Sequence, residues 1–146
     1  MNTTAVKVRE IATFGFTVSD MARAVHFYEE VLGFEKIAET EIAGDAYDAL
    51  SGVAASGARI AHLRLGEQIV EMTEYLSHRG RPIPVPWRGN DLWFQHVAIV
   101  VSDMEKAYEQ LRRHRVGQIS LEPQTIPETN VAAAGIMALK FCDPDG

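Results

Sequence analysis

Two residues of this sequence combine metal-ligating side chains with apolar surroundings. His96 interrupts an apolar run that continues through residues 97–101, and Glu71 lies between Val70 and Met72. A neutral imidazole and a carboxylate are standard ligands for divalent zinc, nickel, manganese or iron. A carboxylate that points into partly apolar surroundings is costly unless it is paired, protonated or bound to a cation. We therefore predict His96 and Glu71 as metal ligands, and a hydrogen-bonded structural histidine is the alternative interpretation of His96.

A repeated motif gives the position of His96 its significance. T-V-S-D-M occupies residues 17–21, and V-V-S-D-M occupies residues 100–104. Each copy closes an alternating apolar run and opens a helical pattern, so the chain resembles one βα unit written twice. Seven residues before the Asp, the first copy has Thr13 and the second has His96. Only the second copy therefore keeps a strong ligand candidate at this position.

Similar elements are predicted around the two copies. Strands at 11–19 and 94–101 alternate between two faces, and each is followed by a helix with an apolar stripe. Ser19 or Asp20 can cap the first helix, and Ser102-Asp-Met-Glu105 matches a capping box at the start of the second. Gly33 and Gly117 end the two helices. Further strands are expected at 34–42, 58–65, 68–75, 118–123 and 135–142, with a tight Gly66-Glu67 turn between 58–65 and 68–75.

This order of elements defines the fold class. Each half is predicted as a βαβββ module with one helix packed on a small sheet, so the chain is α+β. We expect a first module at 1–77, a proline-rich linker at 78–90 and a second module at 91–146, together forming one domain. Residues 44–57 fall outside the repeat and should form a short helix and loop. The chain stops at the turn signal D-P-D-G, so we expect a shortened sequence that lacks the last strand of the second module.

Composition narrows the classes of function. The 146 residues carry 20 acidic and 14 basic side chains, for a net charge of −6. This balance lacks the electrostatic footprint of a nucleic-acid-binding protein. Cys142 is the single cysteine and cannot form an internal disulfide, which favours a reducing compartment. No stretch has the pattern of a signal peptide or the length of a membrane span, so we expect a cytoplasmic protein with no membrane partner.

Several of these runs occur together in a recognisable order. Together they resemble the vicinal oxygen chelate superfamily. The runs that carry this resemblance are the V-S-D-M motif, F-Y-E-E-V-L-G-F at 27–34, V-E-M at 70–72, Q-H-V-A-I-V-V-S-D at 95–103 and the closing D-P-D-G. This superfamily includes glyoxalase I, extradiol dioxygenases and bleomycin-resistance proteins. The resemblance covers residues 11–146 and implies an open, bowl-shaped mixed sheet around a divalent metal. It implies ligand positions at Thr13, Glu71, His96 and a fourth residue beyond Gly146, and of the three visible positions only Thr13 does not fit.

The resemblance leaves two classes of function open. In the first, a metal-dependent lyase, isomerase or dioxygenase acts on a small oxygenated metabolite through a metal-stabilised enediolate, with Glu71 as a candidate general base. In the second, a metal-free protein of the bleomycin-resistance type sequesters a small molecule. A homodimer is expected because exposed strand edges favour pairing with a second copy. The aromatic side chains available for stacking on a small molecule are Trp87, Trp93, Tyr47 and Phe14.

The remaining histidines and the cysteine are predicted to be structural. His26 and His114 should lie on the wet faces of helices, and His78 begins the linker. His62 lies in the strand at 58–65 and is interpreted as structural or cleft-lining. Cys142 has no evident activating neighbour, so we expect its thiol to be inert.

Overall fold

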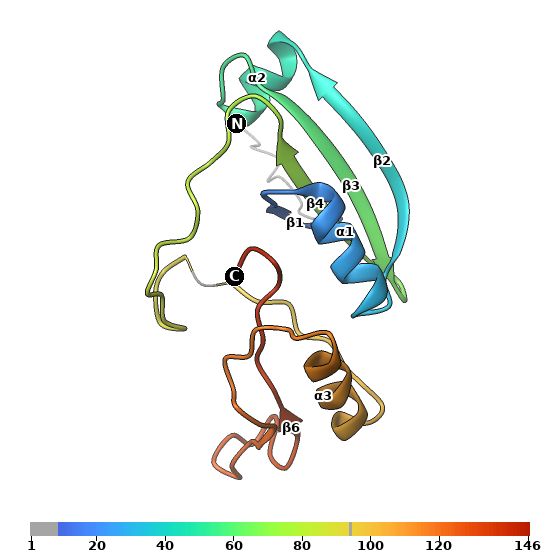
Figure 1. Ribbon diagram of the computed structural model, residues 1–146, viewed down its shortest axis with the longest axis vertical. Helices are drawn as coiled ribbons and strands as arrows, with labels where there is room; N and C mark the ends of the chain where they lie inside the picture. The colour runs from blue at the N-terminus through green and yellow to red at the C-terminus, as the bar shows by residue number, and fades with distance from the viewer. Residues whose placement is uncertain (1–8, 94) are drawn as a thin grey trace, which may run out of the picture.

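The first half of the chain forms a four-stranded mixed sheet covered on one face by a helix. The computed structural model describes residues 9–93 and 95–146. In Figure 1, α1 lies across the sheet, whose strand order is β1-β4-β3-β2. Strand β1 is parallel to β4, and the other neighbours are antiparallel. The elements of this half are β1 (Phe14–Thr17), α1 (Met21–Glu30), β2 (Glu35–Ala43), α2 (Asp45–Ser51), β3 (Gly57–Leu65) and β4 (Gln68–Tyr75).

The core lies between α1 and the two central strands. Alternation along β3 and β4 points every second side chain toward α1, and those in the middle of the two strands are buried. The helix presents an apolar stripe at helical spacing to the same core. Burial of each large apolar side chain here stabilises the fold by about 1.5–3 kcal/mol. The buried residues are Ala61, Leu63, Val70 and Met72 of the strands, Met21, Ala24, Val25 and Tyr28 of the helix, and the flanking Val18 and Phe34.

A two-residue turn sets the register of the central hairpin. Gly66 adopts φ +60°, a conformation that tight hairpin turns require and that glycine adopts without a steric penalty. The first pair after the turn is therefore Leu65 with Gln68, and the pairing continues to His62 with Glu71. The predicted turn and the predicted strand at 68–75 are both confirmed.

The second half contains far less regular structure. It comprises α3 (Met104–Arg113), β5 (Gln124–Thr125) and β6 (Met137–Ala138), with an isolated bridge between Gln118 and Phe141. The strand predicted at 94–101 was wrong for the described residues 95–101, which form no strand; Phe94 lies outside the described residues. The strand predicted at 118–123 was wrong, since this range has only the bridge at Gln118 and β5 begins at Gln124. The strand predicted at 135–142 shortens to β6 and the bridge at Phe141. An alternating sequence forms a strand only where a partner strand completes the hydrogen-bond ladder. The tandem arrangement of two βαβββ modules, with boundaries at 1–77 and 91–146, stays a prediction.

The closing D-P-D-G turn returns to the start of α1. Asp145 accepts hydrogen bonds from the backbone amide of Ser19 at 2.9 Å and from its hydroxyl at 2.5 Å, and it pairs with Arg23 at 2.6 Å. Tyr28 donates to Asp143 at 3.3 Å. Burial, together with the charge of Asp143, raises the pKa of the Tyr28 hydroxyl, which therefore stays protonated. These contacts join the two halves of the molecule (Figure 1).

None of the helices in the described ranges has the length and apolarity that a membrane span requires.

Candidate functional site

Glu71 lies in the middle of the sheet, on the face opposite α1. Its neighbours Val70 and Met72 point into the core, so alternation along β4 turns Glu71 the other way. Gly15 of β1 is paired with Glu71 on one side, and His62 of β3 is paired with it on the other. Ala38 of β2 continues the row beyond His62. The result is one row of Gly15, Glu71, His62 and Ala38 across all four strands, which we call the open-face row.

Glu71 and His62 form a pair within this row. The Nε2 atom of His62 lies 3.1 Å from Oε2 of Glu71. Each side chain is 34% exposed, so the pair is accessible from solvent while its backbone is held in the sheet. The sequence interpretation of His62 as structural or cleft-lining missed this contact. The two-residue turn at Gly66-Glu67 contained the signal, because counting outward from it pairs residue 62 with residue 71.

The other oxygen of Glu71 faces the glycine. A Cβ atom added to Gly15 would lie 3.7 Å from Oε1 of Glu71. Within the described residues, Oε1 has no hydrogen-bond partner, whereas Oε2 is engaged by His62. The two oxygens of one carboxylate therefore have different surroundings. Oε2 is held by His62, and Oε1 adjoins the space beside Gly15, which has no side chain.

Thr13, the residue at the ligand position of the first copy, is engaged elsewhere. Its hydroxyl donates to the backbone carbonyl of Ile69 at 3.1 Å. A threonine hydroxyl is in any case a poor ligand for zinc-like metals, which prefer nitrogen, sulfur and carboxylate donors. Thr13 thus ties the residues before β1 to β4.

Hydroxyl groups surround the open-face row. Thr17 and Thr73 form the next pair on this face of β1 and β4, about 6.6 Å from Gly15 and Glu71 at the usual rise per strand residue. Tyr47 of α2 is buried beside Tyr75 of β4. Burial, a hydrogen bond with Tyr75 and the negative charge of Glu71 raise the pKa of the Tyr47 hydroxyl, which remains a neutral donor. The expected helix within 44–57 is confirmed as α2, and it delivers this tyrosine to the site.

His96 lies in a different environment from Glu71. It lines an apolar cavity of about 370 Å³ together with Phe14 and Val70, whose side chains belong to the face that α1 covers. Residues 97–100 and Gln68 line the same cavity. The structure therefore brings Glu71 together with His62, and it places His96 among apolar side chains. Across residues 9–93 and 95–146, no group of three or more His, Cys, Asp and Glu side chains forms a metal-binding cluster.

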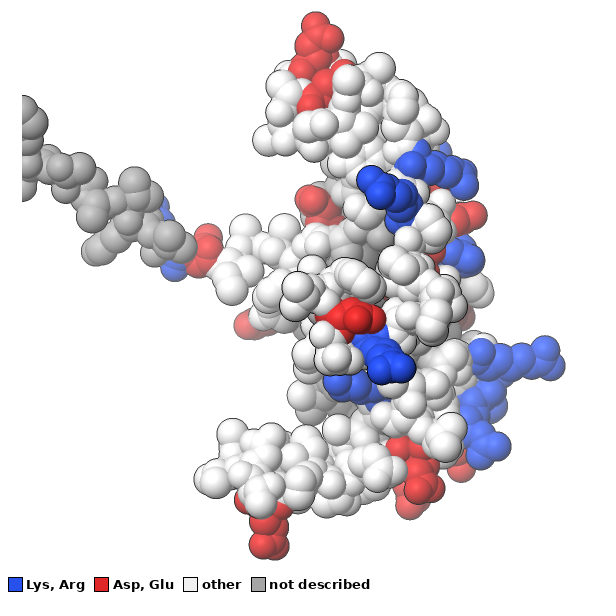
Figure 2. All heavy atoms as spheres, turned by 90° about the vertical axis from the view of Figure 1, so that its left-hand side faces the viewer, with Lys and Arg blue, Asp and Glu red and all other residues white. Residues whose placement is uncertain are grey.

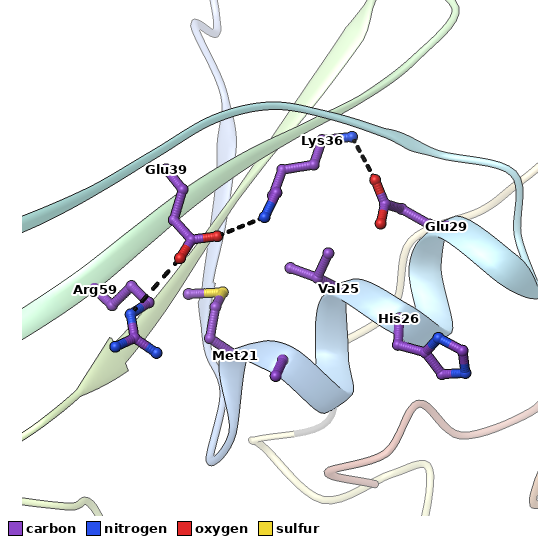
Figure 3. Close-up of a pocket in the computed structure, with 8 residues that line it drawn as sticks. Met21, Val25, His26, Glu29, Lys36, Glu39 and Arg59 are labelled. Atoms are coloured by element: carbon purple, nitrogen blue, oxygen red, sulfur yellow. Dashed lines mark hydrogen bonds and ion pairs between the residues drawn. The ribbon is translucent and has the colours of Figure 1, made fainter.

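A second cavity, of about 330 Å³, lies between α1 and β2 (Figure 3). Its charges satisfy one another: Glu39 pairs with Lys36 at 2.7 Å and with Arg59 at 3.7 Å, and Glu29 accepts the backbone amide of Lys36 at 3.1 Å. The hydrogen bond to Glu39 raises the pKa of Lys36. The ion pairs lie within β2 and between β2 and β3, and the hydrogen bond from the Lys36 amide to Glu29 joins β2 to α1.

The surroundings of the remaining histidines and of the cysteine follow from their elements. His26, His78 and His114 are exposed. Burial, with a contribution from the charge of Asp143, raises the pKa of the Cys142 thiol, which disfavours the reactive thiolate. Figure 2 shows acidic and basic side chains interspersed over the face in view, and no continuous basic patch appears there.

The chain belongs to the Glyoxalase/Bleomycin resistance protein/Dioxygenase superfamily, whose family model matches residues 10–146. The predicted superfamily is thereby confirmed. Superfamily membership alone does not determine the reaction, because one scaffold can carry many chemistries.

One curated relative and two solved structures are similar to this chain. A 2-epi-5-epi-valiolone epimerase from Actinomyces sp is 36% identical over 148 residues, which cover 97% of this chain and 76% of the relative. A glyoxalase family protein from Bacillus cereus superposes with a TM-score of 0.73 at 18% identity, covering 84% of this chain and 83% of that one. Glyoxalase I from Leishmania major has a TM-score of 0.58 at 21% identity, covering 95% and 82%. At these identities the two structures show the fold alone.

Proposed function

We propose that this chain is a small-molecule isomerase that inverts a carbon next to a carbonyl group. The observation that carries the proposal is the one-third-exposed carboxylate of Glu71, held at the centre of the open-face row by His62. A positioned carboxylate near a substrate carbon is the group that proton abstraction requires. The relationship to a protein named as an epimerase supports this type of reaction.

The proposed reaction needs one carboxylate and one solvent proton. Glu71 takes the hydrogen from the carbon as a proton, and the electron pair of the C–H bond moves into the carbonyl group to form an enolate. A proton that originates from water then adds to the opposite face of the same carbon. The product has the inverted configuration, and the proton taken by Glu71 returns to solvent. No oxidant or reductant takes part, so the reaction is an isomerisation.

A divalent metal is the second part of the proposal. Zinc, nickel, manganese or iron would be bound by Glu71 and His96, and it would supply Lewis-acid stabilisation of the negative charge on the substrate oxygen. The donors that the structure brings together are two, His62 and Glu71, and a catalytic zinc site has three protein ligands. The described donors therefore do not complete a metal site, and no step above depends on a metal.

Solvent deuterium tests the reaction directly. The probe is 2-epi-5-epi-valiolone, the compound in the relative's name, incubated with the protein in D₂O. We expect the epimerised product to carry deuterium at the inverted carbon. Glu71→Gln should lower the exchange rate by about 10²–10⁴-fold, the usual contribution of a general base. Glu67→Gln, in the exposed hairpin turn, is the matched control and should exchange normally. Wild-type protein without exchange, or an active Glu71→Gln variant, contradicts the proposal.

Metal analysis tests the second part. If Glu71 and His96 bind the same metal, protein purified without chelators contains close to one divalent metal per chain, and His96→Ala loses it, while the exposed His114→Ala keeps it. Wild-type protein without metal contradicts this part of the proposal. Deuterium exchange that survives complete removal of metal by a chelator would support the isomerase reaction and contradict a role for the metal. In that case Glu71 acts without a metal.

A metal-free binding protein is the second candidate function, and the apolar cavity beside Phe14 favours it. This cavity could hold an apolar part of a ligand without any metal. Calorimetric titration with bleomycin and with the epimerase probe distinguishes the candidates. Binding of either ligand, with the ligand recovered unchanged from D₂O, would favour sequestration over isomerisation.

A homodimer is also proposed. All nine residues of β2 are exposed, and within the described residues this strand pairs only with β3. An edge strand of this length presents a row of hydrogen-bonding groups to a second copy. Size-exclusion chromatography with light scattering should give twice the mass of the chain, and a monomer at all concentrations would contradict the proposal.

A further inference from the structure

We propose that His62 is a positioning residue that makes Oε1 the reacting oxygen of Glu71, and that Gly15 keeps the space at this oxygen open for the substrate. This inference rests on the proposed isomerase function. It assigns the histidine and the glycine of the open-face row a role in that reaction. It also distinguishes the two oxygens of one carboxylate.

The contact between His62 and Glu71 is fixed by the backbone. The two residues lie opposite each other in an antiparallel pair, the fourth pair counted outward from the Gly66-Glu67 turn. Eight consecutive pairs connect β3 and β4, so neither residue can shift along its strand without breaking this ladder. The 3.1 Å contact from Nε2 then holds Oε2 and fixes the rotation of the carboxylate. With Oε2 engaged, Oε1 is left to react.

The residues that flank the pair leave room for a substrate. Gly15 and Ala38 end the open-face row on its two sides, and neither has a side chain that could cover Glu71 or His62. A methyl group at position 15 would stand 3.7 Å from Oε1, where a substrate carbon must approach. The hydroxyls of Thr17 and Thr73 lie in the next row and can bind polar groups of the same substrate.

A purely structural ion pair would behave differently. Pairs that are one-third exposed contribute little to stability, because water screens the charges. Removing the imidazole should therefore leave the protein folded. In contrast, displacing a catalytic group by about 1 Å can lower the rate of the reaction by up to about 10²-fold. The catalytic rate and the free energy of unfolding of a His62 variant therefore distinguish a positioning role from a purely structural one.

The experiment uses three variants and the deuterium-exchange assay with the same probe substrate. We expect His62→Leu to lower kcat by about 10–100-fold with KM changed less than about twofold. His62→Gln keeps an N–H donor and should recover most of the lost rate. Gly15→Ala should raise KM by about tenfold, because its methyl group occupies the approach to Oε1. The matched controls are His114→Leu on the exposed end of α3 and Gly80→Ala, whose added Cβ meets no atom within 4 Å.

The outcomes distinguish this inference from the function on which it rests. An active wild type together with an unchanged kcat in His62→Leu overturns the positioning role and leaves the isomerase intact. An unchanged KM in Gly15→Ala overturns the role of the glycine. Wild-type protein without exchange overturns both the function and the inference. Loss of the far-ultraviolet circular dichroism signal in His62→Leu would show instead that the contact is structural.

Discussion

The two copies of the V-S-D-M motif start helices of the same local geometry in very different tertiary surroundings. The cap residues Asp20 and Asp103 both have φ −151°, with ψ of 110° and 107°. Each accepts a hydrogen bond from the backbone amide three residues later, at 2.9 Å from Arg23 and 3.0 Å from Lys106. A helix cap depends on a few adjacent residues, so repeating those residues repeats the structure.

The strands in front of the two motifs differ. Phe14–Thr17 forms β1 because β4 provides a parallel ladder, from Phe14 with Val70 to Thr17 with Thr73. Residues 95–101 have a comparable alternation but form no strand. All ten residues of the buried core cluster come from the first half, and the buried residue of α3 is Leu111. Helix caps are thus specified locally, whereas a strand requires a partner distant in sequence.

The largest expected effect compares the same substitution in the two halves. Leu63→Ala should destabilise the protein by about 3–5 kcal/mol, because Leu63 is fully buried and the sheet around it cannot collapse. Leu111→Ala, on α3, should cost about 2 kcal/mol or less, because its exposed surroundings can relax. Urea denaturation followed by circular dichroism measures both free energies of unfolding. Equal costs would show that the second half is packed as firmly as the first.

The next effect concerns the contacts between the closing D-P-D-G turn and the start of α1. Asp145→Ala removes the contacts with Ser19 and Arg23, and it should cost about 1–2 kcal/mol, given that Arg23 is half exposed. Release of the turn should also expose Cys142 and speed its reaction with a thiol reagent. The exposed Glu128→Ala is the control. A thiol reaction rate unchanged from the wild type would show that the turn does not depend on this anchor.

The helix caps should be nearly equivalent despite their surroundings. Asp20→Ala and Asp103→Ala should each cost about 1 kcal/mol, since each removes one cap hydrogen bond of the same geometry. Amide hydrogen exchange measures the loss separately in α1 and α3. Costs that differ by more than about 1 kcal/mol would mean that tertiary packing, rather than the cap itself, sets the value.

The smallest effect is the acid sensitivity of the second cap. The backbone hydrogen bond from Lys106, followed by its side-chain hydrogen bond, lowers the pKa of Asp103. A pKa that is depressed in the folded state adds stability above the unfolded value, near 3.9, and this stability is lost as the pH falls through the folded pKa. The protection of the α3 amides, measured as their exchange rate relative to an unstructured chain at the same pH, should therefore decrease below about pH 4. Asp103→Asn keeps a cap but does not titrate, so its exchange should lack this acid-dependent step.

Much of the fold was predictable from local patterns. The helix at 21–30, the turn at Gly66-Glu67 and the strand at 68–75 follow from periodicity and turn chemistry, and the structure has all three. The strand at 94–101 was wrongly predicted from the same kind of alternation. Alternation describes which side chains share a face, but it does not state whether a neighbouring strand is present.

The candidate site was predictable only in part. Glu71 stands out as a carboxylate between buried apolar residues, and the structure places it on the open face of the sheet as this pattern requires. The pairing of Glu71 with His62 follows from the register of a hairpin, so it was implicit in the sequence and still missed. The proposed partnership of Glu71 with His96 depends on how distant segments meet, which local patterns do not describe.

The sequence by itself determined the superfamily and the starts of the two helices, and it marked Glu71 as a candidate site residue, because each follows from motifs that can be read along the chain. Only the tertiary structure decided that β1 is a strand while 95–101 is not, and that His62 is the imidazole beside Glu71. It also decided that Gly15 leaves one carboxylate oxygen open. The physical reason is that ladders and side-chain contacts across a sheet join residues far apart in sequence, and their free energy exists only once the chain has folded.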